Sequence, residues 1–348
     1  MTRTSTAGAG AADATDATDA TDAGSVTAGP VARRTLLHGL PWLVWRRHRT
    51  ALRLLLLTTA VGCAAFAYQR AGLTEFLHTH GAGPADPAGH GTLGTDFENA
   101  YGRLFRTGTQ LMTFLPVLIS VFLGAPLIAG EQEHGTVKLI STQSVSRGRW
   151  VAATLGLPLA VAVLCTALLS AVFTWLWTPA HLLVMDGDWL TSGIFESTGP
   201  VPVARTLFLT VCGTALGMLV KRVVPAMAGT LVLALVTSVL WSEKLRGRLG
   251  TLRSVSYPYD GNGPDLPPGA VRMDDWVSTA DGRLYGFGTC TTGDTGACRA
   301  KLGIVNRVTQ YLDYGQMAGM QWLGAGILLA LTVLVLAFVV WRAHRRPL

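Results

Sequence analysis

Residues 130–150 have the sequence GEQEHGTVKLISTQSVSRGRW, a short segment of mixed charge between two long apolar runs. The run before it is FLPVLISVFLGAPLIA, and the run after it is VAATLGLPLAVAVLCTALLSAVFTWLW. An apolar run of about 20 residues is long enough to cross the hydrocarbon core of a bilayer as a helix. The segment therefore predicts a polar hairpin that joins two membrane-spanning helices.

The composition of the whole chain agrees with a membrane location. Of the 348 residues, 49% are hydrophobic and only 14% are charged, whereas a soluble domain has about 25% charged residues. Apolar runs predict six spans, at residues 51–68, 110–129, 151–177, 205–220, 223–241 and 319–341. We therefore expect an all-α integral membrane protein with six transmembrane helices.

Two segments precede this six-span domain of residues 51–348. Residues 1–30 contain the repeat ATDATDATD and no residues that could form a core, which predicts a disordered N-terminal tail. Residues 31–50 alternate arginines with Leu, Trp and Val, which predicts an interfacial amphipathic segment that Pro41 breaks or kinks. A simple positive flank to the first span is the alternative interpretation.

The distribution of basic residues predicts the orientation. One face of a six-span arrangement collects Arg46, Arg47, Arg49, Arg53, Lys138, Arg147, Arg149, Lys221, Arg222, Arg342, Arg345 and Arg346. By the positive-inside rule this face is cytoplasmic, so both termini and the 130–150 segment lie inside. We expect a multi-pass protein of the cell (plasma) membrane with an external loop at residues 242–318. Basic residues at the start of that loop oppose the rule, but long loops translocate largely regardless of charge.

The 130–150 hairpin has the features of a short helix tied to a span at each end. Glu131 and Glu133 lie at the mouth of the second span, where an unpaired charge is costly. Gly135 ends one helix, Thr136 is suited to cap the next, and Ser146 is suited to cap the third span. Val137, Leu139 and Ile140 supply a short apolar face. Arg147 and Arg149 are candidate partners of the two glutamates or of lipid phosphates.

Five cysteines fall into two groups. Cys63, Cys165 and Cys212 lie within apolar runs, as expected for small core residues. Cys290 and Cys298 flank TTGDTGA, whose glycines and aspartate favour a reversal of the chain. Because the predicted topology places both outside the membrane, we expect a disulfide between them. Neither group has the spacing of a zinc site, and we predict no metal site.

Several classes of function are disfavoured. The basic residues flank apolar runs rather than alternate with aromatic residues, so the net charge of +7 does not indicate a nucleic-acid-binding protein. No G-x-x-x-x-G-K-[ST] motif occurs, so the chain carries no P-loop ATPase of its own. The spans lack the ionisable groups of an intramembrane enzyme. A membrane receptor or scaffold with an external ligand-binding loop remains an alternative to a transporter.

The hairpin resembles the cytoplasmic loop of ABC-2-type transporter permeases, the membrane subunits of ATP-binding-cassette transporters, in its Glu131 or Glu133, Gly135-Thr136 and Ser146-Arg147. WLVWRRHRTAL resembles the start of the first span in that family. GPVPVARTLFLTVCGTALGMLVKRVVPAMAGTL resembles spans four and five in actinobacterial members. YLDYGQMAGMQWLGAGILLALTVLVLAFVVWRAHRR resembles their last span and basic tail.

The resemblance implies a type V exporter-like permease fold with an N-terminal interfacial helix and a cytoplasmic coupling helix. In this family the coupling helix docks on a separate ATP-binding subunit, which binds ATP and magnesium. The resemblance also implies a second permease subunit, identical or different, and no cofactor in this chain. The resemblance implies an exporter, and because the spans are apolar with few charges, we expect its cargo to be amphiphilic or hydrophobic.

Overall fold

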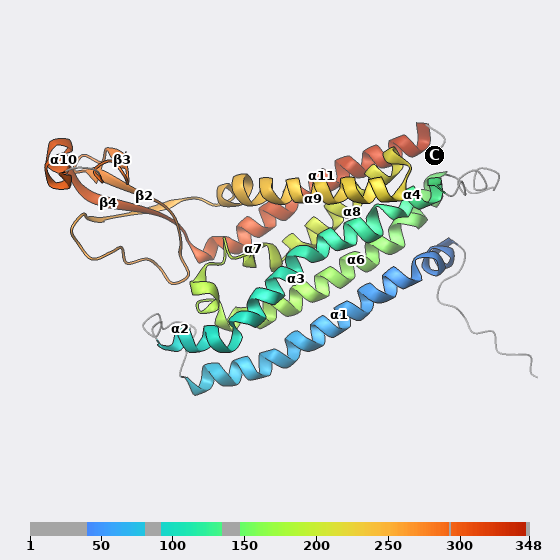
Figure 1. Ribbon diagram of the computed structural model, residues 1–348, viewed down its shortest axis with the longest axis horizontal. Helices are drawn as coiled ribbons and strands as arrows, with labels where there is room; N and C mark the ends of the chain where they lie inside the picture. Colours follow the sequence, from blue (N-terminus) through green and yellow to red (C-terminus); the bar gives the residue numbers. More distant parts are fainter. Residues whose placement is uncertain (1–39, 81–91, 134–146, 292–293, 346–348) are drawn as a thin grey trace, which may run out of the picture. The chain divides into compact units, whose positions relative to one another are not determined.

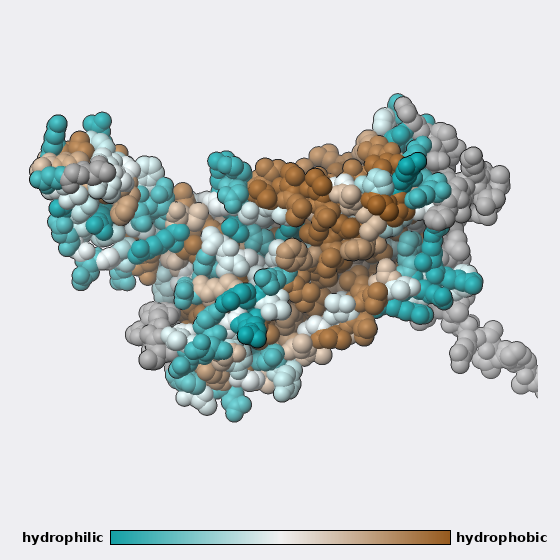
Figure 2. All heavy atoms as spheres, in the orientation of Figure 1, coloured by the Kyte–Doolittle hydropathy of each residue, from teal (hydrophilic) through white to brown (hydrophobic). Residues whose placement is uncertain are grey.

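The structure is a computed structural model that describes residues 40–80, 92–133, 147–291 and 294–345. Six of its helices are long and apolar enough to cross a membrane, which confirms the predicted membrane part of six transmembrane helices. They comprise Val44–Thr79, Leu93–Glu133, Ala152–Ala180, Val201–Val220, Val223–Arg248 and Tyr314–Arg345. Hydrophobic side chains cover the middle of this helical part, and hydrophilic side chains gather at both ends (Figure 2).

The first helix, α1 (Leu40–Thr79), is longer than the predicted span at 51–68. It continues through the second half of the expected interfacial segment without a break, and residues 31–39 lie outside the described residues. The expected break or kink at Pro41 concerns its junction with residues 31–39, which lie outside the described residues. Pro41 is the second residue of the helix, where a missing N–H costs nothing because the first turn has no intrahelical acceptor.

The second span is a chain of short helical segments rather than one regular helix. It consists of α2 (Thr92–Phe97), η2 (Glu98–Gly102), α3 (Arg103–Ile119), η3 (Ser120–Gly124) and α4 (Pro126–Glu133). Both η2 and η3 are single-turn π-helices. Such bulges interrupt the regular hydrogen-bond ladder and often occur at functional positions.

The third to sixth spans follow the predicted order. The third span is α6 (Arg147–Trp177), and a segment of short helices, η4 (Thr178–Ala180), η5 (Val184–Gly187) and α7 (Ile194–Ser197), connects it to the fourth. The fourth and fifth spans are α8 (Val201–Val220) and α9 (Val223–Leu240), which continues as η6 (Trp241–Leu245) and η7 (Arg246–Arg248). After the sheet, η8 (Tyr314–Gln316) leads into α11 (Met317–Arg345), the sixth span.

Residues 242–318, expected only as a loop, contain an antiparallel sheet. Its strands are β1 (Arg253–Pro258), β2 (Val271–Thr279), β3 (Leu284–Gly286) and β4 (Ile304–Leu312), in the order β1-β4-β2-β3. The register pairs Val255 with Thr309 and Trp276 with Val308. Helix α10 (Thr295–Leu302) precedes β4, and a disulfide between Cys290 and Cys298, with a Cα–Cα distance of 5.8 Å, fastens the middle of this helix to the turn after β3. The structure thus contains the bond that the sequence predicted.

Helix α8 is the centre of the helical part. It packs against α3, η3, α4, α6, α9 and α11 and is mostly buried, whereas α1 and α9 are mostly exposed in this chain. Gly213 and Gly217 form a G-x-x-x-G pair on α8 that allows the backbone of the second span to come close. An added Cβ at Gly217 would lie 2.5 Å from the Ala125 carbonyl oxygen. The distorted middle of the second span is therefore packed directly onto α8.

Candidate functional site

Four described helix ends gather at one end of the helical part, on the side away from the sheet (Figure 1). They are the start of α1, the end of α4, the start of α6 and the end of α11. The α8–α9 connection also lies here, because α4 packs against both of these helices. This end therefore holds both attachment points of the segment 134–146, which itself lies outside the described residues.

Glu131 is the first residue that fixes this end. Its carboxylate accepts a hydrogen bond from Nη1 of Arg47 in an ion pair, and the glutamate is only 7% exposed. A buried carboxylate is tolerated when it is paired, and removing one partner leaves an uncompensated charge. Because Arg47 is on α1 and Glu131 is on α4, the ion pair joins the first span to the end of the second.

Glu133 makes a second connection, from α4 to α9. Its Oε2 accepts a hydrogen bond of 2.8 Å from the backbone N–H of Val223, the first residue of α9. The N–H groups of a first helical turn have no intrahelical acceptor and carry partial positive charge, so a carboxylate there is favourable. Arg222, the residue before α9, supplies no side-chain cap of its own. Glu133 thus acts as a cap supplied by another helix.

The predicted coupling residues divide between described and undescribed parts of the chain. Glu131 and Glu133 end α4, as the sequence analysis placed them. Helix α6 begins at Arg147, the residue after the proposed cap Ser146. The side chain of Arg147 lies outside the described residues, together with Gly135, Thr136, Val137, Leu139, Ile140 and Ser146. The sequence analysis missed Arg47 as the partner of Glu131, although it placed both residues on the same face of the membrane.

At the opposite end, the segment between α6 and α8 forms a cap that is fixed to its surroundings by polar contacts. Buried Gln321 of α11 donates through Nε2 to the carbonyl oxygens of Phe195 and Thr198, each at 3.2 Å. Trp189 donates through Nε1 to the carbonyl oxygen of Gly269, just before β2, at 2.8 Å. The cap is therefore tied to both the sixth span and the sheet.

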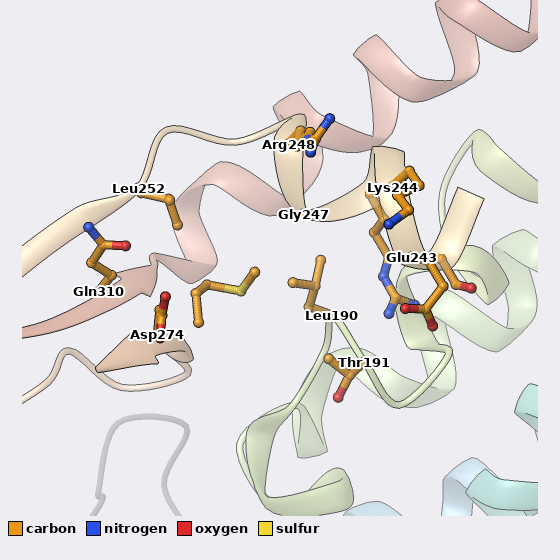
Figure 3. Close-up of a pocket in the computed structure, with 12 residues that line it drawn as sticks. Leu190, Thr191, Glu243, Lys244, Gly247, Arg248, Leu252, Asp274 and Gln310 are labelled. Atoms are coloured by element: carbon orange, nitrogen blue, oxygen red, sulfur yellow. The ribbon is translucent and has the colours of Figure 1, made fainter. Parts of the chain in front are cut away.

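A cavity of about 390 Å³ lies between the cap, the end of the fifth span and the sheet (Figure 3). Leu190 and Thr191 come from the cap, and Asp274 and Gln310 come from β2 and β4. The helical turns η6 and η7 contribute Ser242, Glu243, Lys244, Arg246, Gly247 and Arg248. A second cavity, of about 260 Å³, lies between the cap, α3, α8 and α9, and shares Ser242 and Arg246 with the first.

Comparison with protein families identifies the class of protein. The family model described as ABC-2 membrane transporter related matches residues 56–246, more than half of the chain. The chain belongs to this family. It is therefore a multi-pass transporter permease, the membrane component of a transport system rather than a catalytic subunit. Comparison with curated proteins and with solved structures gave no match.

The match runs from Leu56 within α1 to Arg246, the first residue of η7, and so includes α4, α6 and the whole cap. The sheet and the sixth span lie outside the matched residues. The matched residues include Glu131, Glu133 and Val223, whereas Arg47, the partner of Glu131, precedes them.

Proposed function

We propose that this permease is the membrane subunit of an ATP-driven exporter of amphiphilic or hydrophobic cargo. It works with a separate ATP-binding subunit, which supplies the ATP and magnesium chemistry, and with a second permease subunit. The segment 134–146 docks on the ATP-binding subunit. Basic residues on the same face support a cytoplasmic location for this segment and for both termini, in a chain of the cell membrane.

The observation that carries this proposal is the bracing of α4, the helix that leads into the segment. Glu131 ties α4 to α1, and Glu133 ties it to the first residue of α9. Gly217 of α8 packs on the backbone at Ala125, directly before α4. A displacement of the segment by a nucleotide-driven partner would therefore move three further spans together with α4, which is what coupling requires.

The apolar character of the spans supports an amphiphilic or hydrophobic cargo. Charged groups within spans mark the pathways of ions and small polar substrates. In the described part of the chain, the charges of the candidate spans gather toward helix ends, as Figure 2 shows for one face. A cargo with a long apolar portion suits such spans better than a small ion does.

The test is the variant Leu139→Asp in the full-length chain. Placing a carboxylate in the apolar face of the docking segment should remove the cytoplasmic ATPase that co-purifies with the wild-type chain, because a charge in an interface core is costly when unpaired. The measurements are mass-spectrometric identification of co-purified P-loop proteins and the ATPase activity of the purified complex. Leu284→Asp is the control, since Leu284 is an exposed leucine on β3.

Retention of both the co-purified ATPase and its activity in Leu139→Asp would contradict docking at this segment. Failure of the wild-type chain to co-purify with any P-loop ATPase would favour the alternative, a receptor or scaffold with an external ligand-binding domain. That alternative predicts a ligand for the sheet and no dependence on Leu139.

A further inference from the structure

The 260 Å³ cavity is lined by Arg205, an arginine of the fourth span that forms no ion pair within the described part of the chain. Arg205 lies in the second turn of α8 and donates through Nη2 to the hydroxyl of Ser238 on α9, at 2.6 Å. Ser238 is neutral. Across the described residues, 40–80, 92–133, 147–291 and 294–345, no carboxylate lies within ion-pair distance of Arg205.

The acidic residue of the same cavity is already paired. Glu196 of α7 is 6% exposed and accepts a hydrogen bond of 2.8 Å from Nη1 of Arg246. The cavity is thus lined by two arginines and one glutamate, and its net charge is positive by one unit. A positive charge at this depth is costly unless an anion accompanies it.

The other polar groups of the cavity also favour an anion. The wall includes the hydroxyl of Thr113 and the indole of buried Trp241. The hydroxyls of Ser238 and Ser242 also line it, but they already donate to the carbonyl oxygens of Ala234 and Val239. The Nε1–H of Trp241 has no hydrogen-bond partner among the described residues. A buried donor without an acceptor is rare in proteins, and an acceptor supplied by a ligand would satisfy it. The lining therefore presents donors from Arg205, Trp241 and Thr113, and its one carboxylate, Glu196, already pairs with Arg246.

The cavity borders a surface that is apolar and exposed in this chain. Val239 lines the cavity and is 59% exposed, and its neighbours Leu235, Val236 and Leu240 on α9 are exposed as well. An amphiphile could place its anionic group against Arg205 and its apolar chains along this face of α9. The adjoining 390 Å³ cavity, which shares Ser242 and Arg246, has room for the rest of a larger polar headgroup.

We propose that Arg205, with Ser238, Trp241 and the Glu196–Arg246 pair, forms a binding site for the anionic headgroup of a membrane amphiphile. The group recognised is a phosphate or comparable anion on a lipidic molecule. This proposal rests on the proposed transport function and narrows the cargo to an anionic amphiphile. It locates the site at the end of the spans opposite the segment 134–146.

The experiment measures lipid binding to the purified full-length chain, together with any subunits that co-purify, by native mass spectrometry. Phosphatidylglycerol is the anionic probe and phosphatidylcholine is the zwitterionic comparison. The wild-type chain should bind phosphatidylglycerol more tightly than phosphatidylcholine. Arg205→Gln should weaken phosphatidylglycerol binding by about tenfold or more, because it removes one charge-assisted hydrogen-bond donor.

Two further variants separate a specific site from general attraction of lipid to basic residues. Arg205→Lys keeps the charge and should retain most of the binding. Arg70→Gln is the control and should leave binding unchanged. Arg70 stacks on Trp175 at the same end of the spans and does not line the cavity. Equal phosphatidylglycerol affinity in wild type and Arg205→Gln, or an equal loss in Arg70→Gln, would overturn the proposal.

Inorganic phosphate distinguishes the source of the anion. If the site takes a lipid headgroup, phosphate should displace phosphatidylglycerol only weakly, because it lacks the apolar chains. Displacement by phosphate as effective as that by phosphatidylglycerol itself would overturn the lipid assignment in favour of a free anion. The binding measurement needs no ATP hydrolysis, so its failure is distinct from retention of the co-purified ATPase by Leu139→Asp.

Discussion

Glu131 and Glu98 each form an ion pair with an arginine, but only Glu131 is buried. We expect Glu131→Gln to lower the free energy of unfolding by about 1.5–3 kcal/mol, the range for a hydrogen bond to a charged group. Glu98→Gln should change it by less than about 1 kcal/mol, because the Glu98–Arg106 pair is exposed and screened by water. Thermal unfolding of both variants in the same detergent measures the difference. An equal loss of stability in the two variants would contradict the larger contribution expected of the buried Arg47–Glu131 pair.

The sequence identified Glu131 and Glu133 as important but not their partners. A charge at the mouth of a span requires compensation, and this requirement can be inferred from sequence alone. The partners cannot, because Arg47 is 84 residues from Glu131 and the acceptor role of Glu133 depends on a backbone N–H at the start of α9. Arg205 was missed for a related reason. The sequence does not show that its side chain meets the neutral Ser238 of α9 or that nearby Glu196 pairs with Arg246 instead.

At the scale of elements, two helix glycines have different surroundings. A Cβ added at Gly217 of α8 would lie 2.5 Å from the Ala125 carbonyl oxygen, whereas one at Gly229 of α9 would meet Leu216 at an ordinary 3.8 Å. We expect Gly217→Ala to destabilise the protein by about 1–3 kcal/mol, because backbone cannot move aside cheaply. Gly229→Ala should be neutral or stabilising by up to about 1 kcal/mol from helix propensity.

Thermal unfolding of the two alanine variants in one detergent provides the measurement. A Gly217→Ala protein as stable as Gly229→Ala would contradict the close packing of α8 on the second span. Gly217 packs on Ala125, the residue directly before α4. We therefore also expect Gly217→Ala to lower the ATPase activity of the complex by more than the loss of folded protein accounts for.

The elements differ in how well the sequence predicted them. All six spans were predicted, since each has an apolar run that only a membrane or a large core can bury. The ends of α1 were not, because a helix continues into polar surroundings where hydropathy carries no signal. The sheet was missed because its strands are short, with three to nine residues, and are separated by Gly- and Pro-rich turns that resemble a loop. The π-helices leave no periodic signature.

At the scale of the whole molecule, the side of the membrane on which the sheet lies decides the state of Cys290 and Cys298. Basic residues gather at the opposite end of the spans, so the positive-inside rule places the sheet outside. Thiols persist in the cytoplasm, whereas disulfides persist in oxidising surroundings. We therefore expect the Cys290–Cys298 bond to be present in intact membranes, where it fastens α10 to the end of β3.

A membrane-impermeant maleimide applied to intact cells tests the disulfide and the orientation together. Without reductant, we expect no labelling of either cysteine. After treatment with a membrane-impermeant phosphine, half-buried Cys298 should become labelled, and the label should be absent from the Cys290→Ser/Cys298→Ser double variant. The other three cysteines lie within the spans and serve as an internal background. Labelling without reductant would mean free external thiols, and labelling only after permeabilisation would place the sheet inside the cell and reverse the topology on which export depends.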